Sequence, residues 1–248
     1  MAEAEPHKII AHRGLWALLI VLAVLVADQA LKIWVKTSFF MGEDYEITPW
    51  FHLKFIENNG MAFGLELWSK IGLTVLRIVA VAVLAWILWT LRNTRRLRTG
   101  FIVALALITA GAAGNIFDCV LYGRIFNNPM PPETATMFPA DGGYAPLFEG
   151  RVVDMLYFPF CSWTWPDWMP AIGGQQFEFF QYIFNLADSS ICVGVLLLII
   201  FYNKDFSLMM QIIAGYVPGT KACRERRANL ISGIRPCTVW VFRLSSLK

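Results

Sequence analysis

Charged residues are scarce in this sequence. They make up 16% of the 248 residues, whereas 57% of the residues are hydrophobic. Soluble domains carry roughly a quarter charged residues, so this composition argues against an ordinary water-soluble domain, and the mean hydropathy of +0.53 agrees. The net charge of +3 is small and indicates little by itself. We expect no nucleic-acid partner.

The sequence also lacks a pattern of cysteine and histidine that would bind a metal. It has three histidines and five cysteines, and none of the histidines stands at metal-ligand spacing from a cysteine. The cysteines are scattered and odd in number, so they imply no disulfide framework. We therefore expect neither a metal nor an organic cofactor.

Long apolar runs are abundant, and a membrane-spanning helix needs about 20 mostly apolar residues. Four runs qualify as spans: 15–35, 71–91, 101–122 and 183–202. The first run begins like a signal peptide, but it continues to Val35 without a small-residue cleavage site, so we expect it to be retained. A further run, 206–217, is too short to span and is expected to lie at the interface or to extend the fourth helix.

Lysine and arginine near the spans predict the orientation, because cytoplasmic loops carry an excess of these residues. Basic residues precede the first span, follow the fourth, and form an arginine cluster at 92–98. We expect loops 37–70 and 123–182 on the outer side and both termini in the cytoplasm. On this basis, residues 1–205 form one domain in the cytoplasmic (inner) membrane, and 206–248 form a basic cytoplasmic tail of unknown role.

Several polar residues fall where lipid would make them costly, which marks them as functional candidates. Asp28 and Lys32 are four residues apart, share a helix face and are expected to pair, although a purely structural pair is the alternative. Arg77 can extend its side chain to the interface. Glu57–Gly64 is a turn with a polar edge, for which a structural role is the default.

An Asn-x-x-Asp pattern occurs in two predicted helices at the same depth, as Asn115 with Asp118 and as Asn185 with Asp188. A helix N-cap would explain Asp188 alone, but it explains the repeated pattern less well. Asp154 lies in an apolar run of the second outer loop, where a carboxylate is costly unless it is hydrogen-bonded or paired. That loop can bring Asp154 to the outer ends of the third and fourth helices.

Five segments of the chain resemble, in order, the motif blocks of lipoprotein signal peptidase (signal peptidase II). The resemblance covers residues 15–202. It implies an all-α polytopic membrane protein with four transmembrane helices and a small extracytoplasmic β-cradle. The segments are 28–32, 57–64, 111–118, 151–158 and 184–188.

The resemblance implies that Asp154 and Asp188 are the catalytic pair of an aspartic endopeptidase. Such an enzyme cleaves diacylglyceryl-modified prolipoproteins on the N-terminal side of the lipidated cysteine, and its active site lies near the outer face of the membrane. We expect this chain to be a monomer that also contacts membrane lipid. Supporting or substrate-binding roles are implied for Asn58, Gly60, Asn115, Asp118, Asn185, Ala187, Asp28 and Lys32.

Two features depart from the family pattern. The third block usually continues Asp-Arg, but Cys119 follows Asp118 here, and Arg124 or Arg151 is the candidate replacement for that substrate-holding arginine. The segment 123–151 is also long, which suggests a lid or partner surface. A catalytically weakened homologue, a proton-coupled transporter and a non-enzymatic scaffold remain as alternatives, of which the transporter usually has more helices or an internal repeat.

Overall fold

The computed structural model describes residues 6–58, 70–92 and 94–214, with side chains from residue 12 onward. Gly60 and the tail beyond 214 therefore lie outside the described residues. The chain divides into two compact units, Met1–Tyr202 and Asn203–Lys248. In the second unit the described element is helix α6 (Asn203–Ile213), and all other elements belong to the first unit.

Among the described residues, three helical spans are long and apolar enough to cross a membrane, or four if helix α5 (Leu186–Phe201) and α6 count together as one bent span. They are His12–Ser38, Lys70–Leu91 and Thr99–Ile125. Many large apolar side chains on these helices are exposed, as expected where the solvent is lipid. The helices of the first unit are α1 (Pro6–Ser38), α2 (Lys70–Leu91), α3 (Thr99–Phe117), η2 (Asp118–Tyr122), α4 (Gly123–Ile125) and α5 (Leu186–Phe201).

The third predicted span is present as Thr99–Ile125, but two of the predicted helices differ in detail near the site. The helix expected over 101–122 is α-helical only to Phe117 and then becomes the π-helical turn η2, which re-aims the side chains from Asp118 onward. The helix expected over 183–202 begins only at Leu186, because Asn185 has extended backbone and caps it. The residues just before Asn185 form strand β6 (Ile183–Phe184) instead.

A four-stranded antiparallel sheet has the order β1-β2-β3-β6. Strands β1 (Asp44–Thr48) and β2 (Phe51–Asn58) lie in the 37–70 loop. Strand β3 (Val152–Tyr157) lies between β2 and β6 and is buried along almost its whole length. A second, two-stranded sheet pairs β4 (Cys161–Thr164) with β5 (Gln176–Phe179).

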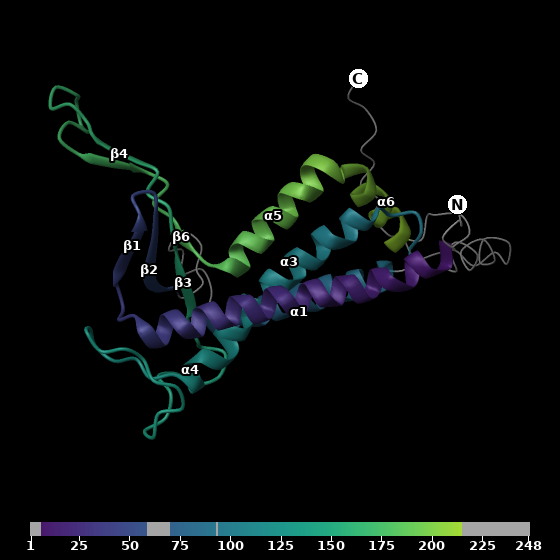
Figure 1. Ribbon diagram of the computed structural model, residues 1–248, viewed down its shortest axis with the longest axis horizontal. Helices are drawn as coiled ribbons and strands as arrows, with labels where there is room; N and C mark the ends of the chain where they lie inside the picture. Colours follow the sequence, from purple (N-terminus) through teal and green to yellow (C-terminus); the bar gives the residue numbers. More distant parts are fainter. Residues whose placement is uncertain (1–5, 59–69, 93, 215–248) are drawn as a thin grey trace. The chain divides into compact units, whose positions relative to one another are not determined.

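Helix α3 packs against α1, α2 and α5, and the four-stranded sheet lies beside the Ser38 end of α1 (Figure 1). Glycines permit the closest approach: a Cβ at Gly111 would lie 2.2 Å from the carbonyl oxygen of Ala187 in α5. A Cβ at Gly114 would lie 2.8 Å from Oδ2 of Asp28 in α1. The sequence Gly-Ala-Ala-Gly thus brings three helices together at one depth.

A buried ion pair joins the sheet to α1. The Lys36 ammonium pairs with Glu57 of β2, and Nη1 of Arg151 lies 3.1 Å from the other Glu57 oxygen. Lys36 also lies 5.2–5.7 Å from the ring centroids of Phe55, Phe126 and Tyr144. This cluster fixes β2 and the residue preceding β3 against the end of α1.

Candidate active site

A fully buried triad of charged side chains forms the floor of the site. Nζ of Lys32 lies 2.9 Å from Oδ2 of Asp28 and 2.7 Å from Oδ2 of Asp118, so the expected Asp28–Lys32 pair is present and Asp118 joins it. The third Lys32 donor bonds to Oδ1 of Asn115 at 2.9 Å. All three ammonium protons are thereby used, as burial of a lysine requires.

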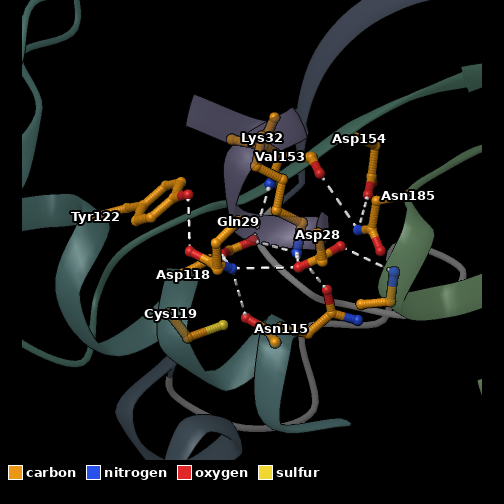
Figure 2. Close-up of polar contacts among 12 residues, drawn as sticks. Asp28, Gln29, Lys32, Asn115, Asp118, Cys119, Tyr122, Val153, Asp154 and Asn185 are labelled. Carbon is orange, nitrogen blue, oxygen red and sulfur yellow. Dashed lines mark hydrogen bonds and ion pairs between the residues drawn. The ribbon is translucent and has the colours of Figure 1, made fainter. Parts of the chain in front are cut away.

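Two polar side chains complete this network (Figure 2). Gln29 donates from Nε2 to Oδ1 of Asp118 at 2.8 Å, and Tyr122 donates its hydroxyl to Oε1 of Gln29 at 3.0 Å. The triad is thus connected to the π-helical turn η2 that contains Asp118 and Tyr122.

The triad also fixes the start of α5. Oδ1 of Asp28 accepts a 2.9 Å hydrogen bond from the backbone N–H of Ala187, in the first turn of α5. A carboxylate at this position satisfies an N–H that has no partner within the helix and interacts favourably with the helix dipole. Ala187 itself is fully buried, so its backbone makes the contact and its small side chain permits it.

Asn115 transmits the geometry of the triad to Asp188. Because its Oδ1 faces Lys32, its amide Nδ2 points the other way and donates to Oδ1 of Asp188 at 2.7 Å. The same carboxyl group is the N3 member of a capping box on α5, in which its Oδ2 accepts from the backbone N–H of Asn185 at 3.4 Å. Asp188 therefore receives two N–H donors.

Asn185 holds Asp154 next to the start of α5 (Figure 2). Its Oδ1 accepts from the backbone N–H of Asp188 at 2.9 Å, which leaves Nδ2 to donate to Oδ1 of Asp154 at 2.7 Å and to the Val153 carbonyl at 3.2 Å. The Asn-x-x-Asp pattern in this segment is therefore both a helix cap and a connection to β3. The side chain of Asn185 is completely buried.

Asp154 has an unusual electrostatic environment. Burial and, to a smaller extent, the negative charge of Asp188 raise its pKa, hydrogen bonds from Asn185 and Asn58 and the charge of Lys32 lower it, and the net result is a pKa of about 7. The side chain is 2% exposed. A carboxyl group of this kind is half protonated near neutral pH, which suits general acid–base chemistry.

The sequence did not predict the contact that Arg77 makes with Cys119. Its Nη1 lies 3.3 Å from Sγ of Cys119, so a guanidinium from α2 reaches the position where the family resemblance led us to expect an arginine side chain. Of the two candidate replacements, Arg151 pairs with Glu57 and Arg124 is exposed. The signal available in the sequence was the cost of an arginine within an apolar helix.

The expected site residues thus fall into one connected arrangement, apart from Gly60, which lies outside the described residues. Within the described part of the chain, no group of three or more His, Cys, Asp or Glu side chains is arranged to hold a metal ion. Together the apolar helices, the buried triad and two electrostatically coupled carboxyl groups define a polytopic membrane protein with a paired-carboxyl site. A solved structure described as a bacterial membrane enzyme resembles this chain with a TM-score of 0.50 and 25% identity, over 77% of this chain and 89% of that one.

The sequence comparisons are more specific. The family model for signal peptidase (SPase) II matches residues 20–204, and the chain belongs to this family of peptidases. A lipoprotein signal peptidase of Porphyromonas gingivalis is 46% identical over 195 residues, covering 79% of this chain and 85% of that protein. One from Amoebophilus asiaticus is 35% identical over 187 residues, covering 73% and 75%. The resemblance stated from the sequence is confirmed.

Proposed function

We propose that this chain is an aspartic endopeptidase that removes signal peptides from diacylglyceryl-modified prolipoproteins, on the N-terminal side of the lipidated cysteine. The observation that supports it most directly is the pair of carboxyl groups, Asp154 and Asp188, each held by an asparagine amide. Their charges interact, so one proton shared between them is favoured over two ionised groups. Membership of a peptidase family gives no support to the transporter alternative.

The two carboxyl groups have different surroundings, which suggests different roles. Asp188 receives two N–H donors, as suits an anion, and Asp154 is buried with a raised pKa, as suits a proton donor. We assign Asp188 as the base and Asp154 as the acid. General acid–base action of this kind is typically worth about 10²–10⁴-fold in rate.

The reaction then follows in two steps. Asp188 accepts a proton from a water molecule while the water oxygen bonds to the scissile carbonyl carbon, and Asp154 donates its proton to the carbonyl oxygen. When the tetrahedral intermediate collapses, Asp154 recovers its proton, the C–N bond breaks, and Asp188 delivers its proton to the leaving amine of the lipidated cysteine. Both carboxyl groups return to their starting states.

The location of the pair fits this substrate. Asp154 lies on a strand of the small sheet and Asp188 in the first turn of α5, so both lie where the helices meet the sheet. We infer that this end faces outward and that both termini are cytoplasmic, in line with the arginine cluster at the opposite end of α2. The acyl chains of the substrate would then remain in the bilayer while its peptide reaches the carboxyl groups.

The test is a gel-shift cleavage assay with purified protein in detergent and a diacylglyceryl-modified prolipoprotein. Asp154→Asn and Asp188→Asn should each abolish cleavage, because neither amide can exchange the required proton, and both proteins should still purify folded. Asp141→Asn, which removes an exposed carboxylate from the 123–151 segment, is the control and should cleave normally. Near-normal turnover by either site variant would refute the assignment, and folded wild type without activity would support a weakened homologue.

A further inference from the structure

An apolar groove lies away from the paired carboxyl groups, between α1 and α2. Its volume is about 600 Å³, within the range typical of sites for small organic ligands. Its floor includes Thr109 of α3, whose hydroxyl bonds to the Leu105 carbonyl at 2.7 Å and so presents no free polar group. The walls are formed by Gly14, Leu15, Ala17, Leu18 and Val21 of α1 and by Ala85, Leu88 and Trp89 of α2.

One end of the groove carries a positive charge in a fixed position. Arg92 lines the groove directly after the end of α2, and its guanidinium carbon lies 3.5 Å from the centroid of the Trp89 ring. Gly14 leaves room for this side chain, because a Cβ there would lie 3.1 Å from Cδ of Arg92. The arginine is thus held against both walls of the groove.

The charges within the segments that form the groove are of one sign. Arg13 precedes Gly14 and bonds through Nη1 to the Leu97 carbonyl at 3.2 Å, while its buried Nε–H has no hydrogen-bond partner among the described residues. Residues 6–27 and 70–117 contain no aspartate or glutamate. This end of the groove is therefore complementary to an anion.

We propose that the groove binds an acyl chain of an anionic phospholipid, with the lipid phosphate at Arg92. An apolar groove that ends at arginines matches an acyl chain joined to a charged headgroup. The substrate's own signal peptide fits less well, since the basic start of such a peptide would meet the arginines with the same charge. This proposal concerns lipid retention and does not depend on the cleavage chemistry.

The experiment measures lipid binding by native mass spectrometry on delipidated protein, using phosphatidylglycerol and phosphatidylcholine with the same acyl chains. The wild type should prefer phosphatidylglycerol. Arg92→Gln should weaken its binding roughly fivefold, the effect of about 1 kcal/mol per basic residue near anionic lipid. Arg96→Gln removes an equal charge from an exposed position of the same loop and should change binding less than twofold.

A second matched pair tests the groove itself. Ala85→Phe fills a wall position and should reduce binding of both lipids, whereas Ala82→Phe places the same ring at an exposed position of α2 that does not line the groove and should not. Equal binding of the two lipids by wild type, equal effects of the two arginine variants, or no effect of Ala85→Phe would overturn the proposal. So would displacement of phosphatidylglycerol by an unlipidated signal peptide.

Discussion

Asp154 determines the expected pH dependence of the enzyme. Burial and the neighbouring Asp188 raise its pKa to about 7, so its proton is present below that pH and lost above it. Because the proposed mechanism needs Asp154 protonated, kcat/KM should fall about tenfold for each pH unit above 7. The measurement is the cleavage rate between pH 5 and pH 9, and a rate that stays flat to pH 9 would exclude Asp154 as the acid.

Arg77 gives a second prediction at the level of single residues. If its guanidinium takes the place of an arginine at position 119, Arg77→Gln should raise KM for the prolipoprotein several-fold with a smaller effect on kcat. Adding Cys119→Arg to that variant should restore KM, since the charge returns to the same location. Arg124→Gln, at an exposed position, should leave KM unchanged. Failure of the double variant to recover, with folding intact, would assign Arg77 a structural role.

At the scale of single residues, the sequence identified which polar residues matter but not, in most cases, which side chains they contact. The Asp28–Lys32 pair was predictable because residues four apart on a helix face one another. Neither the contact of Arg77 with Cys119 nor that of Lys36 with Glu57 was predictable, because each joins elements distant in the chain. Their partners are set by how the helices pack, which no local pattern encodes.

At the scale of elements, small residues of α3 control how closely it approaches α5. Gly111→Ala should lower the melting temperature and reduce activity, because the added methyl would meet the Ala187 carbonyl and push away the helix that carries Asp188. Overpacking of this kind typically costs about 1–3 kcal/mol. Ala112→Val, at a half-buried position of the same turn, is the control. Thermal unfolding in detergent checks this, and equal losses in both variants would contradict it.

The ends of the elements were the least predictable part of the fold. Hydrophobicity located the apolar segments because lipid imposes a minimum length. It did not distinguish the π-helical turn at Asp118 from continued α-helix, since the apolar span runs through both without a break. It also placed Ile183 and Phe184 in a helix although they pair with β3, because short apolar runs suit either state.

For the whole molecule, the proposed orientation can be tested with the chain's own cysteines. Cys161 is free and exposed on β4, in the loop we infer to be outside, whereas Cys223 belongs to the tail beyond the described residues, which we infer to be cytoplasmic. In spheroplasts, a membrane-impermeant maleimide should label a variant that retains only Cys161. A variant that retains only Cys223 should react only after permeabilisation, and the reverse pattern would invert the topology.

Asn185 links the start of α5 to Asp154 through one side chain. The same side chain caps α5 and bonds to Asp154, so opening of the first turn of α5 would disturb the positions of both carboxyl groups. If Asp154 and Asp188 are the catalytic pair that we propose, activity requires that this single helical turn be closed.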